Sequence, residues 1–534
     1  MMSIQDETSS DRWLSHCVWI VALWASFFNL LNFNGYPLFR PEVAITMLAL
    51  ALVGGVMALL QQAAKPRLWF LVVALFAAVL VDLNASISAI WFLGCWAIFA
   101  VIAFYVREVF VKILFAAAAA VLFFQGAELV LDDGSPREAG NEAQNLQDPD
   151  RDRADRPAIV HLVLDSYLGL DGMALGPDIY RDLRSEQVRF FTSHDFQVYP
   201  RAYSPYAKTL NSLPALFSYG QDEPVVHSIT SEYSIPEQLP YFADLDAMGY
   251  RIDALLPAYF DLCVKQKLTQ CRTFESSGLS SMLGTGMSAT DRAKVFGFTM
   301  LNLTRTIRSA TGRIRPDPGA RLAHNRSELF PLTSLGQFDS FIADVAGLRE
   351  GEVKFAHILL PHDPYMLAAD CTVKPESRWL DEHGPGTAAA REQGYADQVR
   401  CLQQRLDRLL DALDRTPAGR EAIVLIHGDH GSRIAPTQPF VDGPQLSPRE
   451  LLMSYSTFFA IRVSGESPGE VPGTHSLGRL MADFRAREFA AAPRPAPAVD
   501  QVAVTDAAGT PREWRPLPGF TREINKILAK PLHV

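Results

Sequence analysis

An Asp-His pair follows an apolar run in the last third of the chain. Residues 423–426 are Ile-Val-Leu-Ile, and His427, Gly428, Asp429, His430 and Gly431 come directly after them. Such a run predicts a buried strand, and open α/β sheets bind ligands where their strands end. A carboxylate beside an imidazole suits a divalent metal such as zinc, and flanking glycines allow a tight turn around it. An isolated pair of this kind is more often a polar turn, so other residues must decide.

Two further predicted strands end in groups that hold metals or phosphates. Residues 158–164 are followed by Asp165, and the run 354–360 is followed, after one proline, by His362. The carboxyl ends of parallel strands lie at one edge of a sheet, so these groups are expected to converge with Asp429 and His430. Two Asp and one His leave a metal position open, as a catalytic site requires. The alternatives are that Asp165 caps a turn and that His362 is a loop histidine.

A hydroxyl nucleophile is available in the stretch Ser204–Ser218, where Thr209 precedes a predicted helix. A bound divalent cation stabilises a threonine alkoxide and neutralises an incoming phosphate, and the first N–H groups of a helix hold anions. The alternative is a helix cap. Ser212 is the second candidate nucleophile.

These motifs resemble the alkaline phosphatase superfamily, and within it the membrane-anchored branch of phosphoethanolamine transferases and lipoteichoic acid synthases. Thr209–Ser218 is similar to the Thr-x-x-Ser-x-Pro-x-Met/Leu-Phe-Ser nucleophile segment of the transferases, and Lys208 before it is similar to the synthases. Gly428–Gly431 resembles the family's metal-binding Asp-His, and His362–Tyr365 resembles its His-Gly-Pro stretch. The resemblance covers nearly the whole chain.

The resemblance implies one divalent metal ion, zinc or manganese, held by Asp165, Thr209, Asp429 and His430, with Thr209 as the nucleophile. It implies substrate contacts around His362, Lys208, Ser212 and Arg433. Two positions depart from the family pattern: Asp165 stands where Glu is common, and Ser432-Arg433 stands where Glu-Ser is expected. These departures bear on the donor and acceptor rather than on the chemistry.

The implied activity is transfer of a phospholipid head group, phosphoethanolamine or phosphoglycerol, to an envelope glycan or lipid acceptor through a phosphothreonine intermediate. A hydrolase, either a sulfatase or a phosphodiesterase, is the first alternative. The segment Ser212–Leu216 lacks the arginine of the sulfatase Cys/Ser-x-Pro-x-Arg motif, which disfavours sulfate esters. The second alternative is a non-catalytic membrane protein that binds or senses a ligand.

The first quarter of the chain predicts a transmembrane domain, residues 1–126. A bilayer needs about 20 apolar residues per helix. Asp82 and Asn84 are expected at the polar tip of a hairpin. Five segments are nearly free of charge: 13–31, 43–60, 68–83, 87–106 and 109–124.

The loops of this domain predict its orientation. Lys65, Arg67, Arg107 and Lys112 follow the second and fourth segments, whereas the first and third loops contain only Arg40. By the positive-inside rule, everything after the fifth segment is extracytoplasmic. With the resemblance, this predicts a multi-pass protein of the bacterial inner (cytoplasmic) membrane whose catalytic domain is periplasmic.

Cysteine positions agree with that orientation. Cys17 and Cys95 lie in the apolar segments, and the other four cysteines can form two disulfides in an oxidising compartment. The favoured pairing is Cys263 with Cys271, which closes a short loop, and Cys371 with Cys401; the other connectivities stay open. The net charge of −10 argues against a nucleic-acid partner.

Residues 127–156 have the composition of a linker, and residues 157–534 predict one large α/β/α domain with a mainly parallel sheet. Strands are also expected at 354–360 and 457–463, and helices at 341–348 and 395–413. Residues 287–308 mix apolar and basic side chains. They predict either an amphipathic helix on the membrane surface or, as the favoured reading, a packed surface helix.

Overall fold

The protein is described by a computed structural model, and its chain divides into two compact units. The helical unit contains Met1–Ser135, Gly278–Leu283 and Met287–Arg326, and the sheet unit contains the remainder. Residues 287–326 therefore group with the helices, whereas the sequence predicts them within the domain 157–534. The described residues are 9–33, 36, 38–63, 68–85, 88–131, 156–220, 238–263, 265–274, 289–290, 292–293, 296, 329–382, 386–434, 446–495, 501–505 and 511–516.

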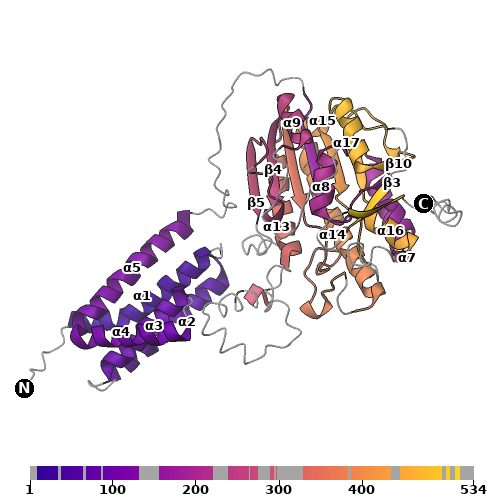
Figure 1. The fold of residues 1–534 in the computed structure, drawn as a ribbon. Helices are drawn as coiled ribbons and strands as arrows, with labels where there is room; N and C mark the ends of the chain where they lie inside the picture. The colour runs from indigo at the N-terminus through magenta and orange to yellow at the C-terminus, as the bar shows by residue number, and fades with distance from the viewer. Residues whose placement is uncertain are drawn as a thin grey trace, which may run out of the picture. The chain divides into compact units, whose positions relative to one another are not determined.

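Each of the five predicted apolar segments lies wholly or largely in a helix of the helical unit, and the segment 87–106 extends past α4 at both ends (Figure 1). Among the described residues, α2 and the part of α5 from Val109 to Ala127 are long and apolar enough to cross a membrane, whereas α1, α3 and α4 have shorter apolar stretches. Large apolar side chains such as Leu52 and Ile90 are exposed, which is typical of a surface that faces lipid. The helices are α1 (Ser9–Phe33), α2 (Pro41–Ala63), α3 (Trp69–Ala85), α4 (Ala89–Tyr105) and α5 (Arg107–Leu131).

Two details of this unit differ from the sequence expectation. Helix α3 continues to Ala85, so Asp82 lies inside a helix and is buried instead of lying at a hairpin tip. Asp82 also has an interaction partner, which satisfies a polar group that would otherwise be costly to bury. Helix α5 extends to Leu131, past the predicted boundary at residue 126.

The sheet unit is built on an eight-stranded, mainly parallel sheet, which confirms the predicted fold class. The strand order is β5-β4-β6-β1-β7-β8-β2-β9. Strands β5 to β7 in this order are parallel, and β8 is antiparallel to both of its neighbours. The strands are β1 (Ile159–Leu164), β2 (Gln197–Val198), β4 (Arg251–Pro257), β5 (Gln270–Phe274), β6 (Glu352–Ile358), β7 (Ile423–Gly428), β8 (Phe459–Arg462) and β9 (Gly469–Glu470).

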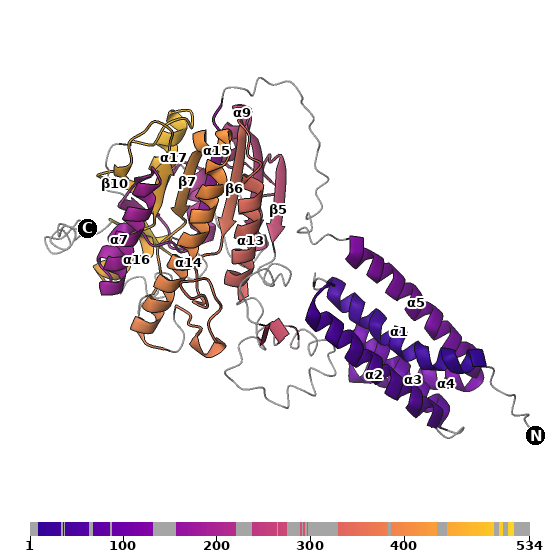
Figure 2. The ribbon, with the colours of Figure 1, turned by 180° about the vertical axis from the view of Figure 1, so that it is seen from behind.

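Helices cover both faces of the sheet. Helices α8 (Thr209–Phe217), α9 (Pro240–Ala247) and α17 (Leu477–Ala486) lie on the face shown in Figure 1. Helices α7 (Asp178–Ser193), α13 (Phe330–Val345) and α14 (Ala388–Asp414) lie on the face shown in Figure 2. Ile159 and Val163 of β1 pack with Leu213 and Phe217 of α8 in one buried cluster, because alternate residues of a strand point to the same face.

The predicted helices at 341–348 and 395–413 lie within α13 and α14, although α13 already ends at Val345. The remaining elements are short: α6 (Leu170–Ala174), α15 (Pro417–Glu421), α16 (Pro448–Tyr455), β3 (Arg201–Tyr203), β10 (Thr474–Ser476), β11 (Gln501–Thr505), β12 (Pro511–Pro516), η1 (Ala258–Phe260) and η4 (Glu376–Arg378).

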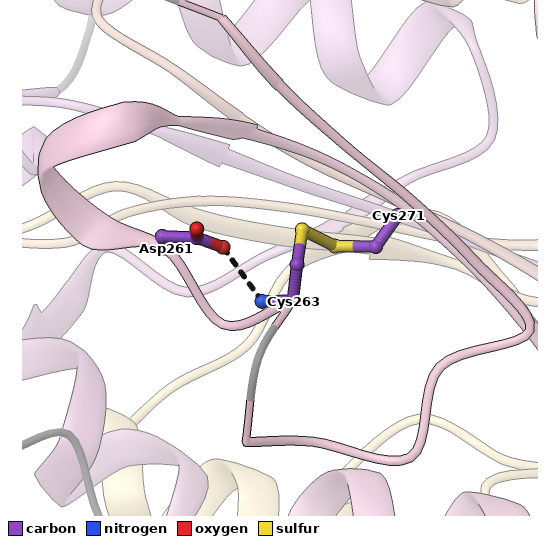
Figure 3. A group of neighbouring side chains, drawn as sticks. All are labelled: Asp261, Cys263 and Cys271. Atoms are coloured by element: carbon purple, nitrogen blue, oxygen red, sulfur yellow. Dashed lines mark hydrogen bonds between the residues drawn. A yellow bond between two sulfur atoms is a disulfide. The ribbon is translucent and has the colours of Figure 1, made fainter. Parts of the chain in front are cut away.

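Two disulfides tie loops to this framework, and they are the favoured pairs, Cys263–Cys271 and Cys371–Cys401. The first closes the connection between β4 and β5. In Figure 3, the Cys263 backbone N–H donates to the Asp261 carboxylate at 2.7 Å, and the two sulfurs are bonded to each other. This group is therefore a crosslink, because thiols joined in a disulfide are not available as metal ligands.

Candidate functional site

The chemically active residues meet at the carboxyl edge of the sheet. Strand β1 lies between β6 and β7, and Leu164 pairs with both Ile358 and Gly428. The residues that follow these strands, Asp165, Asp429 and the loop to His362, therefore leave the sheet at the same level. The order of the parallel strands thus brings together groups that are more than 260 positions apart.

Asp165, Asp429 and His430 form a compact buried cluster. One ligand atom from each lies within 4.8 Å of the others. His430 Nε2 is 3.7 Å from Asp165 Oδ1 and 3.5 Å from Asp429 Oδ2, and it has no hydrogen-bond partner in the described part of the chain. Buried polar atoms are nearly always satisfied. A ring nitrogen that faces two carboxylates in this way fits a divalent cation, so the residues are suited to hold the implied metal.

The pKa values of His430 and Asp165 are those expected of a buried site that can hold a cation. Burial lowers the pKa of His430 to about 4, and its Nδ1 donates to the carbonyl of Gly431 at 2.8 Å. The Nε2 lone pair is therefore free at neutral pH. Burial and the nearby Asp429 carboxylate raise the pKa of Asp165 to about 7, because like charges at close range disfavour ionisation. A cation between the carboxylates would relieve this repulsion.

The backbone around Asp429 is closely packed. A Cβ atom at Gly431 would overlap the carbonyl oxygens of Met453 and Ser456, so close approach of another backbone explains this glycine. Ser166 has a φ of 62°, in the left-handed region, and its N–H donates to Asp429 Oδ1 at 2.9 Å. His430 N donates to the same oxygen at 2.8 Å. Asp429 is thus held in one orientation before any ligand binds.

Thr209 is the first residue of α8 and lies against the cluster. Its Oγ1 donates to Asp429 Oδ2 at 2.6 Å, and the residue is 9% exposed. Lys208 precedes it at the N-cap position. The hydroxyl is therefore adjacent to the metal ligands, and the first turn of a helix, whose N–H groups favour anions, surrounds it.

Ser212 differs from Thr209 in that its hydroxyl is committed to the protein. It donates to the carbonyl of Asp429 and shares a 2.7 Å hydrogen bond with Ser204 Oγ, and it is 1% exposed. The expectation that Ser212 binds substrate or replaces Thr209 as nucleophile stays a prediction. We assign it to holding α8 against the end of β7.

A second, cationic cluster adjoins the first. Arg433 donates through Nε and its backbone N to the Glu382 carboxylate, both at 3.1 Å. His362 Nδ1 lies 2.9 Å from Asp363 Oδ1. The Arg433 Nη2 atom lies 2.7 Å from His362 Nε2. Two cationic side chains are thus held side by side, each by its own carboxylate.

The charge state of His362 bears on whether His362 and Arg433 can bind an anion together. Burial acts to lower the pKa of His362, but the charges of Asp165 and Asp363 outweigh it and raise the pKa to about 10. The 2.7 Å contact with Arg433 can be a hydrogen bond only while His362 Nε2 carries no proton. Because the raised pKa favours the protonated form, His362 and Arg433 both present N–H donors at this point, and a phosphoryl oxygen could accept from both.

Comparison with known proteins adds similarities of fold. No family model and no curated protein matches the chain. Among solved structures, the zinc complex of the C-terminal periplasmic domain of EcEptC from Escherichia coli is 11% identical, covering 70% of this chain and 98% of that one, with a TM-score of 0.41. The phosphonate monoester hydrolase of Agrobacterium radiobacter is 14% identical, covering 67% and 79%, with a TM-score of 0.38.

A third is a Vibrio parahaemolyticus protein that is 12% identical, covering 62% and 66%, with a TM-score of 0.36. It is described as a member of the alkaline phosphatase superfamily, which the sequence motifs also resemble. Similarities this low do not indicate the activity of this chain, which depends on its own residues.

Three residues of the site do not appear in the sequence prediction. Tyr259, in η1 after β4, donates to Asp165 Oδ2 at 3.2 Å. Glu382 holds Arg433 from a loop before α14. His357 of β6 is fully buried, and its ring nitrogens have no hydrogen-bond partner among the described residues. Of these three residues, Tyr259 has a sequence feature that points to the site: it closely follows the short apolar run Ala254–Pro257, as expected for a residue just after a strand.

Proposed function

We propose that the protein is a metal-dependent transferase of the alkaline phosphatase superfamily that moves a phospholipid head group through a phosphothreonine intermediate on Thr209. The observation that carries the proposal is the Thr209 hydroxyl at 2.6 Å from Asp429, in a cluster whose His430 nitrogen faces two carboxylates. A threonine that only capped α8, or an Asp-His pair that only formed a polar turn, would not need to lie together in one buried cluster.

In the first step, Thr209 Oγ attacks the phosphorus of the donor phosphodiester and its proton passes toward Asp429 Oδ2, which accepts its hydrogen bond. The bond from phosphorus to diacylglycerol breaks, and the proton taken up by Asp429 passes through solvent to the leaving oxygen, so that diacylglycerol departs as an alcohol and Asp429 is a carboxylate again. A bound divalent cation supplies charge that stabilises the Thr209 alkoxide and the phosphoryl oxygens. His362 and Arg433 hold the other phosphoryl oxygens.

In the second step, an acceptor hydroxyl attacks the phosphorus of phosphothreonine. The new P–O bond forms as the bond to Thr209 Oγ breaks, and the proton of the acceptor returns to Thr209. Because Thr209 is restored, each turnover consumes one donor lipid and one acceptor hydroxyl. An envelope glycan or lipid is the proposed acceptor, on the basis of the family resemblance.

The charges around the site favour a donor head group without an ammonium group. Asp363 and Glu382 are paired with His362 and Arg433, while Asp165 and Asp429 belong to the metal cluster. The ammonium group of ethanolamine would therefore have to compete with His362, Arg433 or the metal ion for these carboxylates. We propose phosphoglycerol as the transferred group, with phosphoethanolamine as the alternative outcome.

A lipid donor agrees with the helical unit. The exposed apolar side chains and the two helices long enough to cross a membrane support anchoring in a bilayer. We propose a multi-pass protein of the bacterial inner membrane with the sheet unit on the periplasmic side, where disulfides are stable.

The decisive experiment is intact-mass analysis of the Thr209 peptide after the full-length, zinc-loaded protein is incubated with phosphatidylglycerol or phosphatidylethanolamine. A phosphoglycerol increment on Thr209 is expected. Thr209→Val is expected to lose the adduct while keeping its zinc, because three protein ligands remain. Thr192→Val, at a half-buried threonine near the end of α7 on the other face of the sheet, is the matched control and is expected to keep the adduct.

The same experiment separates the alternatives. If the head group bound to Thr209 is lost at the same rate with and without an acceptor, water is the acceptor and the protein is a hydrolase. No increment on any Thr or Ser, with either lipid, contradicts covalent transfer and leaves a binding or sensing role.

A further inference from the structure

A long insertion leaves the sheet unit between β5, which ends at Phe274, and α13, which begins at Phe330. Residues 287–326 of this insertion group with the helical unit rather than with the domain from which they come. The chain thus returns to the helices well after the linker that first joins the two units.

Phe296 is a described residue of the insertion that packs against two aromatic rings of the helical unit. It is 5% exposed. Its ring lies edge-on to Phe27 of α1 with centroids 6.1 Å apart, and edge-on to Tyr36 with centroids 5.1 Å apart. Edge-to-face aromatic pairs at this separation are favourable beyond the area that they bury.

With Phe296 in place, both of its aromatic partners on the helical unit are buried. Phe27 is 3% exposed and Tyr36 is 1% exposed. The Tyr36 hydroxyl donates to Glu42 Oε1 at 2.7 Å, which holds the ring in place between α1 and α2. The insertion also brings Arg292 near this hydroxyl, since its charge acts on Tyr36 together with that of Arg40.

We propose that Phe296 is a second anchor of the sheet unit, a non-covalent one that binds the aromatic pocket of Phe27 and Tyr36. The segment that follows this anchor enters α13, and Phe330, its first residue, lies edge-on to His362 with ring centroids 5.1 Å apart. Because the insertion is continuous with α13, this anchor would link the two units independently of residues 132–155.

The insertion is also basic, so it could be held near the helices by anionic lipid instead of by Phe296. Residues 287–326 contain eight Lys or Arg and two Asp, a net charge of +6. Such a segment binds anionic lipid surfaces through charge alone. A test of the Phe296 anchor must therefore exclude the bilayer.

The test uses the full-length protein with a protease site inserted in the linker and an affinity tag at the N-terminus. After purification in a neutral detergent and cleavage, the N-terminal helices are captured and the co-retained C-terminal fragment is quantified. The wild-type fragment is expected to stay bound, including at high salt, which screens ionic contacts. Phe296→Asp is expected to lower retention by about tenfold.

Matched variants separate anchoring from misfolding. Ala293→Asp adds the same charge at an exposed position in the same segment and is expected to retain the fragment. Tyr36→Ala alters the pocket instead of the insertion and is expected to weaken retention. Uncleaved Phe296→Asp must elute as a single species with both disulfides formed. Release of the wild-type fragment, or full retention of the Phe296→Asp fragment by such a folded protein, overturns the proposal.

Discussion

At the scale of single residues, the site consists of a cluster of two carboxylates and a histidine beside a pair of cationic side chains, which Asp363 and Glu382 hold. Asp165 and Asp429 repel each other, which raises the pKa of Asp165 together with burial. His362 and Arg433 lie 2.7 Å apart. A divalent cation on the first cluster and a phosphoryl group on the second would satisfy both, and the two ligands would also attract each other. The residue types thus favour binding of metal and phosphate together.

Glu382 makes this arrangement testable, because it positions Arg433 without belonging to the metal cluster. Glu382→Gln removes the charge and keeps the shape, so Arg433 loses a charge-assisted contact worth about 1.5–3 kcal/mol. The rate of Thr209 adduct formation is expected to fall roughly 10- to 100-fold. The bound zinc, measured by elemental analysis, is expected to stay at the wild-type level.

The control for this variant is Glu421→Gln, at an exposed position of α15, which is expected to leave the rate unchanged. If Glu382→Gln reacts at the wild-type rate, Arg433 does not depend on this carboxylate. If it loses zinc, Glu382 supports the metal cluster instead of the phosphate.

At the scale of elements, the site depends on connections as well as on strand ends. Tyr259 reaches Asp165 from η1, in the connection between β4 and β5 that the Cys263–Cys271 disulfide closes. The Cys371–Cys401 disulfide joins the loop after β6 to α14. Both crosslinks therefore restrict loops that border the site.

The two disulfides are expected to stabilise the protein unequally. In the chain-entropy description, a crosslink with a separation of 8 contributes about 2.5 kcal/mol and one with a separation of 30 about 3.6 kcal/mol. Replacing Cys371 and Cys401 by Ser should therefore lower the thermal midpoint more than replacing Cys263 and Cys271. The measurement is calorimetry of the full chain in detergent.

Reduction of the wild-type protein should lower the midpoint at least as far as either double variant. Cys17→Ser with Cys95→Ser is the control, because both thiols are free, and it should respond to reductant as the wild type does. Equal midpoints for the two disulfide variants would contradict the dependence on loop length.

The strand ends could be predicted from the sequence because unbroken apolar runs mark fully buried strands. The runs before Asp165 and Asp429 are of this kind, and both residues lie at the expected edge. Strand β4 is different, because Arg251 and Asp253 interrupt its apolar run. The sequence therefore predicts neither this strand nor a role for Tyr259, which follows it. The same limit applies to Glu382, whose loop carries no periodic pattern.

Contacts between distant segments could not be predicted. The run 287–308 shows an amphipathic composition, and a packed helix was the favoured reading. Phe296, a described residue of this run, contacts Phe27 and Tyr36, which lie some 260 positions earlier. Composition indicates that Phe296 needs an apolar neighbour but not which one, because many exposed apolar surfaces exist on these helices.

At the scale of the whole molecule, the sheet unit buries several histidines in neutral form. His161 of β1 lies between the Tyr241 hydroxyl, at 2.7 Å, and His427 Nε2, at 2.8 Å. Burial lowers the pKa of His161 well below 6.5 and lowers that of His357 to about 4. These buried histidines therefore couple folding to pH.

The direction of this coupling follows from the folded-state pKa values, which lie below the unfolded value near 6.5. As pH falls below 6.5 the unfolded chain binds protons that the folded chain excludes, so stability is lost at about 1.4 kcal/mol per pH unit for each such histidine. Thermal midpoints of the full chain, measured with a chelator at pH 8, 6.5 and 5, should fall mainly below pH 6.5. His357→Phe and His357→Gln should each reduce the loss between pH 6.5 and 5 by about 2 kcal/mol, although their stabilities at pH 8 differ. A loss that neither variant reduces would mean that His357 is protonated in the folded protein, and the unpaired nitrogens of its buried ring would then require a counter-charge from the neighbouring metal cluster.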